Sequence, residues 1–187
     1  MNIFNRTCRH PHILWISITI VGILLDQLTK LLVSGNMELY ESIPVWEGVF
    51  HFTYIRNDGA AWGIFADQRW VFLITSSVTI IAMIAFLLLT KSRNPMIISA
   101  VAMILSGGIG NMIDRLAFGS VVDMIHVALI NFPVFNVADC FVCVGAALLF
   151  LAVLLEKEDA PAAEASTEEC PEKADEADSE DSEQDDI

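Results

Sequence analysis

The stretch that decides the fold is FNVADCFVCVGAALLFLAVLL, residues 135–155, in which one aspartate, Asp139, opens an otherwise apolar run. From Val137 to Leu155 this run is close to the ~20 residues that a helix needs to cross ~30 Å of hydrocarbon. An ionisable group is costly there, so a membrane protein that keeps one is expected to use it. A second aspartate, Asp123, follows the preceding apolar run. Two carboxylates that can meet suggest acid–base chemistry.

Three other apolar segments of membrane length precede this one, at about Ile13–Val33, Trp70–Thr90 and Met96–Leu116. Apolar residues make up 55% of the chain, and the mean hydropathy is +0.56, which is too apolar for an ordinary soluble domain. We therefore predict an all-α membrane protein with four transmembrane helices.

The first apolar run follows Arg6 and Arg9, an arrangement that superficially resembles a signal peptide. However, the run contains Asp26 and Lys30, lacks a small-residue cleavage site and is followed by three more spans. We expect it to be retained as the first span.

The net charge of -14 is a property of the carboxyl-terminal tail. Residues 156–187 contain 15 of the 24 acidic residues and 2 of the 10 basic ones, so the body is nearly neutral. We predict a four-span membrane domain over residues 1–156 and an acidic, disordered cytoplasmic tail over residues 157–187. Nothing in the body indicates a nucleic-acid partner.

The basic residues predict the orientation of the spans. An even number of spans places both termini on one side, together with Lys91, Arg93 and Lys157, and this side carries more Lys and Arg than the other. We expect both termini to be cytoplasmic. Nearly every unusual polar residue of the body then converges at the outer face of the membrane, as an active or binding site there requires. These residues are Asp26, Lys30, Asn57, Asn111, Asp114, Arg115, Asp123, Asn136 and Asp139.

The connection between the first two spans, Ser34–Arg69, lies on the outer side and is too long for a plain turn. Residues Val49–Arg56 alternate, which predicts a short strand or hairpin at the outer interface, a small extracytoplasmic β element beside the helices. Its aromatic residues could cover the site as a lid. The residues concerned are Phe50, Phe52, Tyr54 and Trp62.

Each of these charged residues also has a purely structural interpretation, without a role in binding or catalysis. Asp26 and Lys30 are four residues apart and can form an ion pair that only holds the first span in place. Asp114 and Arg115 can simply cap a helix end, and Asp139 can be an ordinary first-turn acid. The last interpretation weakens because Asp123 and Asn136 lie nearby, with so little other polar material around them.

The remaining reactive side chains give weak signals. Cys140 and Cys143 form a C-x-x-C inside an apolar helix, and we interpret them as buried small hydrophobic residues. The histidines show no metal-ligand spacing in pairs, and we expect them at the surface or the interface. They are His10, His12, His51 and His126.

The polar residues leave three classes of function open: an enzyme, a small transporter or proton-coupled channel with the same acids as relay groups, and a non-enzymatic membrane subunit. A transporter predicts polar residues at mid-span and often internal repeats. A subunit predicts that the aspartates matter for assembly only.

Five motifs occur in a fixed order: Asp26-Gln-Leu-Thr-Lys30, Asn57-x-Gly59-Ala-Ala, Gly107-Gly-x-Gly-Asn111-x-x-Asp114-Arg115, Val122-Asp123 and Phe135-Asn136-x-Ala-Asp139. Together they resemble lipoprotein signal peptidase, the bacterial signal peptidase II, over about residues 13–156. Each motif alone is weak, but five in order at these spacings are very specific.

The resemblance implies a four-helix aspartic endopeptidase of the bacterial cytoplasmic (inner) membrane. Its substrates would be prolipoproteins that carry diacylglycerol, cut just before the lipidated cysteine, with Asp123 and Asp139 as the catalytic dyad. It needs no metal or cofactor, and we expect a monomer in contact with membrane lipid. The resemblance assigns supporting or substrate-binding roles to Asp26, Lys30, Asn57, Gly59, Asn111, Arg115 and Asn136.

Overall fold

The computed structural model describes residues 10–59, 69–130 and 132–164, and four long helices account for most of them. These helices are α1 (Pro11–Asn36), α2 (Arg69–Leu89), α3 (Pro95–Phe118) and α4 (Val137–Glu164). Each contains a segment long and apolar enough to cross a membrane, and in α4 this segment is Val137–Leu155. The predicted class, an all-α membrane protein with four spans, is confirmed.

A small antiparallel sheet accompanies the helices. Its strands are β1 (Ser42–Trp46), β2 (Phe50–Asn57) and β3 (Val121–Val127), in the order β1-β2-β3, and a short 3-10 turn, η3 (Ala128–Ile130), follows the last strand. The sequence predicted the hairpin but not β3. Residues 121–124 are all buried, so the strand lacks the alternation by which a half-exposed strand is recognised.

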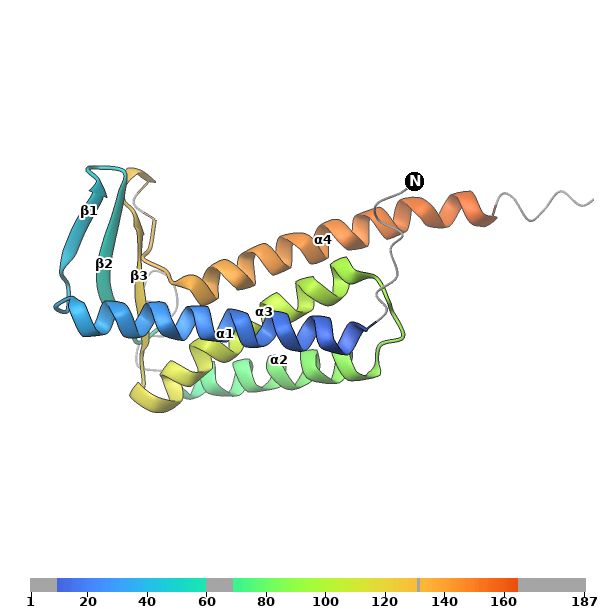
Figure 1. Ribbon diagram of the computed structural model, residues 1–187, viewed down its shortest axis with the longest axis horizontal. Helices are drawn as coiled ribbons and strands as arrows, with labels where there is room; N and C mark the ends of the chain where they lie inside the picture. The colour runs from blue at the N-terminus through green and yellow to red at the C-terminus, as the bar shows by residue number, and fades with distance from the viewer. Residues whose placement is uncertain (1–9, 60–68, 131, 165–187) are drawn as a thin grey trace, which may run out of the picture. The chain divides into compact units, whose positions relative to one another are not determined.

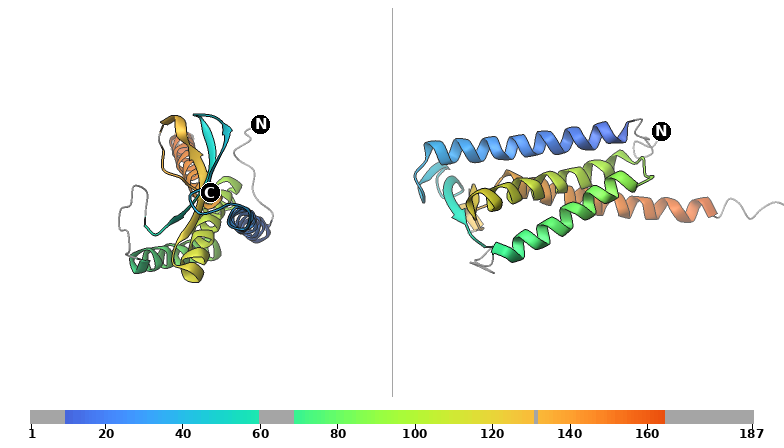
Figure 2. Two further views of the ribbon diagram at one scale, coloured as in Figure 1. Left: turned by 90° about the vertical axis from the view of Figure 1, so that its left-hand side faces the viewer. Right: turned by 90° about the horizontal axis from the view of Figure 1, so that it is seen from below.

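The sheet lies at one end of the bundle, where α1 and α3 end and α4 begins (Figure 1). Figure 2 shows the same arrangement from two further directions. At this end α3 stops at Gly119, whose φ of 83° is left-handed, and β3 begins two residues later. The chain therefore passes almost directly from α3 into the strand that carries Asp123.

Local sequence explains where α1 and α3 begin. Pro11 and Pro95 occupy the first turns of α1 and α3, where a missing N–H does no harm. Asn94 caps α3, because its side chain accepts a hydrogen bond from the backbone N of Met96 at 2.9 Å.

Glycines allow α1, α3 and α4 to pack at close range. A Cβ on Gly107 would collide with the backbone carbonyl of Ala138, and one on Gly110 would collide with the carboxylate of Asp26. Small residues at helix contacts are typical of membrane bundles, where backbone approach replaces the hydrophobic effect as the source of packing energy.

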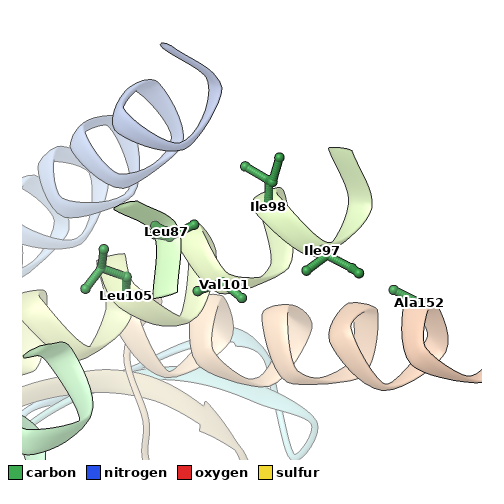
Figure 3. Packing of buried hydrophobic residues seen from close by; sticks show 6 residues of the cluster. All are labelled: Leu87, Ile97, Ile98, Val101, Leu105 and Ala152. Carbon is green, nitrogen blue, oxygen red and sulfur yellow. The ribbon is translucent and has the colours of Figure 1, made fainter. Parts of the chain in front are cut away.

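An apolar cluster joins α2, α3 and α4 away from the sheet (Figure 3). Its buried members are Leu87, Ile97, Ile98, Val101, Leu105 and Ala152. The opposite faces of the helices expose many large apolar side chains, Leu31 at 67% and Ile81 at 66% among them. Such faces suit a lipid environment.

Met1–Val153 forms one compact unit and Leu154–Ile187 a second. The described part of the second unit is the end of α4, which continues to Glu164. Residues 165–187 lie outside the described residues, so the disorder of the acidic tail stays a prediction.

The close contact at Gly110 leads to a stability test. Gly110→Ala is expected to lower the free energy of unfolding by about 1–3 kcal/mol, because the new methyl group overpacks a site next to the Asp26 carboxylate. Thermal unfolding in detergent would measure the loss.

The matched control is Gly108→Ala, where the nearest heavy atom, Cγ1 of Ile80, would lie at 3.6 Å. There alanine should be neutral or stabilise the helix. Equal melting temperatures for the two variants would contradict the packing argument.

Candidate active site

A cavity of about 670 Å³ lies beside the beginning of α4. Both aspartates singled out from the sequence, Asp123 and Asp139, line it. Two further polar side chains, those of Asn57 and Arg115, line it together with Gly59. The rest of its described wall is apolar or carries thiols: Phe72, Phe132, Pro133, Val134, Phe135, Cys140, Cys143 and Val144.

Asp139 is held by the start of its own helix. Its backbone N donates to Oδ1 of Asn136 at 2.9 Å, and its Oδ2 accepts from the backbone N of Asn136 at 3.1 Å. This reciprocal pair has the geometry of a capping box, with asparagine at the N-cap and the acid at the third helical position. The first-turn interpretation of Asp139 is therefore correct, and the same carboxylate also faces the cavity.

Asn136 connects the two aspartates. Its side chain is fully buried, and Nδ2 donates to Oδ1 of Asp123 at 2.6 Å. Its Oδ1 and its backbone N form the two hydrogen bonds to Asp139. Asn111 of α3 gives a second link, because its Nδ2 donates to Oδ1 of Asp139 at 2.9 Å and its Oδ1 accepts from Nδ2 of Asn136 at 3.1 Å. Two asparagines thus set the relative positions of the carboxylates.

Asp123 approaches the cavity from β3 and is 2% exposed. Its Oδ2 accepts a hydrogen bond from Nδ2 of Asn57, at the end of β2, at 2.9 Å. Burial raises the pKa of Asp123 to about 6, and the carboxylate of Asp139 adds to the rise, whereas the hydrogen bonds from Asn57 and Asn136 oppose it. A carboxyl group with a pKa this close to neutrality can exchange protons during a reaction.

A buried ion network lies behind the cavity. Nζ of Lys30 is 2.9 Å from Oδ2 of Asp26 and 3.1 Å from Oδ2 of Asp114, and it donates to Oδ1 of Asn111 at 2.9 Å. An ammonium group has three donors, and all three are used here. The ion-pair interpretation of Asp26 and Lys30 fits this geometry, since neither is among the described residues that line the cavity.

The acids of this network also hold the elements that carry the dyad. Oδ1 of Asp26 accepts from the backbone N of Ala138 at 2.9 Å, which fixes the first turn of α4. Oδ2 of Asp114 accepts from the backbone N of Val122 at 3.1 Å, which fixes β3 next to Asp123. Gln27 bridges the two acids, with Nε2 at 3.1 Å from each carboxylate. Sequence reasoning gave Gln27 no role, although it was a polar side chain inside a span.

Arg115 binds backbone carbonyl groups. Nη1 donates to the carbonyl of Asn111 and Nη2 to that of Gly59, both at 3.5 Å, and the guanidinium lies 4.8 Å from the ring centroid of Phe72. The backbone N of Gly59 donates to Oδ1 of Asn57 at 3.0 Å, which closes a turn after β2. Arg115 therefore joins α3, α2 and this turn at the cavity wall.

Two sequence expectations need correction. Cys140 is half-buried and Cys143 is exposed, and both line the cavity, so they are not buried packing residues. Cys140 follows Asn136 by four residues and Cys143 follows Asp139 by four. Side chains at this spacing share a helix face, so the face of α4 that carries these polar residues continues through the two thiols. No aromatic residue of β2 is among the described residues that line the cavity: Phe52 lines a separate hollow with α1, and Tyr54 packs on Val122. Trp62 lies outside the described residues.

The sheet also brings together two histidines that the sequence kept apart. His51 and His126 are cross-strand partners of β2 and β3, with ring centroids 5.8 Å apart. The pairing register was needed to place them side by side.

Comparison with known proteins decides the family. The profile of the family described as signal peptidase (SPase) II matches residues 18–155. The chain belongs to this family. It is thus a peptidase, and the four apolar helices make it a multi-pass membrane protein.

Relatives of the signal peptidase II family cover most of the chain. The lipoprotein signal peptidase of Bacillus subtilis (strain 168) is 43% identical over 145 residues, which are 76% of this chain and 94% of the relative. That of Lactococcus lactis subsp. lactis (strain IL1403) is 42% identical over 141 residues, 75% of this chain and 93% of the relative.

Two solved structures share the fold of this chain. One, described as a bacterial membrane enzyme, superposes with a TM-score of 0.72 at 30% identity and covers 85% of this chain and 94% of the other. A second with the same description has a TM-score of 0.69 at 32% identity and covers 75% of this chain and 92% of the other.

The Lys30 network predicts a large loss of stability from one substitution. Lys30→Met is expected to lower the free energy of unfolding by about 3–5 kcal/mol, because Asp26 and Asp114 would remain buried without their cation. Adding Asp114→Asn to this variant should recover part of the loss, since one uncompensated charge is removed. Unfolding in detergent would measure both changes.

Lys91→Met is the matched control, because Lys91 is an exposed lysine in the α2–α3 connection. It should shift the free energy of unfolding by no more than about 0.5 kcal/mol. A Lys30→Met variant as stable as this control would show that the network contributes nothing measurable.

Proposed function

We propose that this chain removes the signal peptide from diacylglyceryl-modified prolipoproteins by an aspartic-peptidase mechanism. The observation that carries the proposal is the bridge through Asn136, which holds the carboxylates of Asp123 and Asp139 at one cavity wall. Family membership supports the reaction, and the geometry supports these two residues as the catalytic pair.

The proposed chemistry needs a single proton on the dyad. Two carboxylates that share a site do not both ionise easily, and the raised pKa of Asp123 agrees with a proton held between them. The ionised member takes a proton from a water molecule, which attacks the scissile carbonyl. The protonated member donates to the carbonyl oxygen and later to the leaving amine. No covalent intermediate forms.

The supporting residues fall into three groups. Asn57, Asn111 and Asn136 hold the carboxylates through side-chain amides. Gly59 and Arg115 line the cavity, where they can position the substrate backbone. Asp26 and Lys30 act from behind, as positioning residues for α4 and Asn111.

The composition of the cavity supports a lipid-modified substrate. Aromatic and aliphatic side chains, among them Phe72, Phe132 and Val144, surround the polar pair. An apolar enclosure excludes water and strengthens the electrostatic interactions of the dyad. It also accepts the acyl chains next to the bond that is cut, just before the lipidated cysteine.

We place the site at the outer face of the bacterial cytoplasmic membrane. The Lys and Arg distribution supports cytoplasmic termini, which puts the sheet and the dyad outside. On this topology residues 1–156 form the peptidase domain, and the acidic residues 157–187 form a solvated cytoplasmic tail. The proposed enzyme acts as a monomer in contact with membrane lipid.

The two alternative classes account for less of the site. A transporter predicts polar groups along the spans, whereas the hydrogen-bonded set joins the end of α3, the start of α4 and the sheet. The subunit class explains the Lys30 network, which does hold helices together. It does not explain why two further carboxylates face a cavity.

The dyad is tested by cleavage of a diacylglyceryl-modified prolipoprotein with purified protein. Asp123→Asn and Asp139→Asn are each expected to lower kcat/KM by about 10²–10⁴-fold, because each removes a proton-transfer group. An unlipidated substrate in the same detergent should resist the wild-type enzyme.

Asp58→Asn is the matched control, since Asp58 is an exposed acid beside the site and is not among the described lining residues. It should stay within about twofold of the wild type. Melting temperatures would verify that all three variants are folded. A folded Asp123→Asn or Asp139→Asn enzyme with normal turnover would rule out the dyad.

The hydrogen bond from Asn57 predicts a shift in the pH dependence. This bond favours the ionised form of Asp123, so its loss in Asn57→Ala raises the pKa of that carboxyl group further. The pH profile of kcat/KM should move to higher pH by about half to one unit, the equivalent of one hydrogen bond. Rates on a lipidated substrate between pH 4.5 and 9 would show it. Thr53→Ala, on the same strand, should leave the profile in place. If the substitution only disturbed the loop, the rate would fall equally at every pH. A pH profile that does not move would therefore contradict the assigned effect of Asn57 on the pKa of Asp123.

A further inference from the structure

The wall of the cavity contains two thiols that the peptidase mechanism does not use. Cys140 and Cys143 both line the cavity that contains Asp123 and Asp139. Cys143 is exposed and Cys140 is half-buried, so Cys143 is the more accessible residue of the two. Neither thiol was assigned a role by the sequence pattern, which placed them among packing residues.

Helix geometry places Cys143 next to the catalytic group. Cys143 follows Asp139 by four residues, which is about one turn of α4 and a rise of about 6 Å. Side chains at this spacing are neighbours on the helix surface. The face continues with Val144, which also lines the cavity. A group attached to Cys143 therefore occupies space directly beside the dyad.

The thiol pair is poorly suited to an internal disulfide. Side chains three residues apart on a helix have Cβ atoms about 5–6 Å apart, whereas a disulfide requires about 3.5–4.5 Å. The two cysteines are free. Their available chemistry is reaction with an external thiol-directed reagent.

We infer that Cys143 is a thiol modification site inside the substrate cavity, and that uncharged thiol-directed electrophiles attached there exclude the substrate. This inference rests on the proposed function of the cavity. With an alkyl methanethiosulfonate, the cysteine sulfur attacks the reagent's sulfenyl sulfur. A disulfide bond forms, the bond to the sulfonyl group breaks, methanesulfinate leaves and the thiol proton passes to solvent. The apolar wall around Cys143 favours reagents with a hydrophobic substituent.

The test uses the full chain in detergent with benzyl methanethiosulfonate as the probe. Cys8→Ser and Cys170→Ser are introduced first, so that only the two cavity thiols remain. Cleavage of a lipidated prolipoprotein is measured before treatment, after treatment and after dithiothreitol. Intact mass gives the number of benzylthio groups, and peptide mapping gives their position.

Treatment is expected to modify Cys143 and to lower activity by about tenfold or more, since displacement of the substrate by even an ångström loses rate steeply. Dithiothreitol should restore the activity. After Cys143→Ser is added, treatment should cost less than about twofold relative to the same variant untreated. The matched control carries serine at all four cysteine positions and Ser34→Cys, an exposed site at the end of α1. It should be modified and keep its activity.

The remaining outcomes separate two failures. If the untreated protein cuts no lipidated substrate, the proposed function fails and the inference fails with it. If the protein is active but modification of Cys143 leaves activity unchanged, the inference alone is wrong. The same holds if neither cavity thiol reacts under conditions that modify Ser34→Cys, or if the loss of activity persists in Cys143→Ser.

Discussion

The structure depends on one buried ammonium group. Nζ of Lys30 is shared among Asp26, Asp114 and Asn111, and each of these partners holds a different part of the site. Asp26 binds the first turn of α4, Asp114 binds β3, and Asn111 binds Asp139. A desolvated cation is tolerated in such a place only when its partners are complete, so the three elements must assemble together.

The proposed catalytic pair is positioned by ordinary secondary-structure chemistry. The capping box of Asn136 and Asp139 satisfies backbone groups that every helix start leaves free, and it also points one carboxylate into the cavity. Asp123 arrives from a strand whose pairing with β2 places it near Asn57. Local folding rules and the proposed chemistry therefore use the same atoms, and little additional structure is needed to preorganise the site.

The sequence predicted much of this arrangement because membrane spans and charged residues within them give strong signals. The four helices followed from the apolar segments, and span order placed Asp123, Asp139 and Asn136 at one end of the bundle, where they meet. The pairing of the two aspartates came from the family resemblance. Other features depended on contacts that a linear pattern does not contain. β3 lacked alternation because its first four residues are buried, and the thiols were misassigned because the cavity beside α4 became visible only in three dimensions. The bridging role of Gln27 likewise required the approach of α3 to α1.

The short passage from α3 into β3 has a consequence for how such chains can diverge. Side chains alternate across a strand, so one residue inserted between Gly119 and the strand residue Asp123 would turn its carboxylate to the other face of the sheet. The connection between β1 and β2 has no such restriction, because neither end of it carries a cavity residue. Length variation among relatives should therefore accumulate in hairpins and tails and be rare at this junction, where chain length itself determines chemistry.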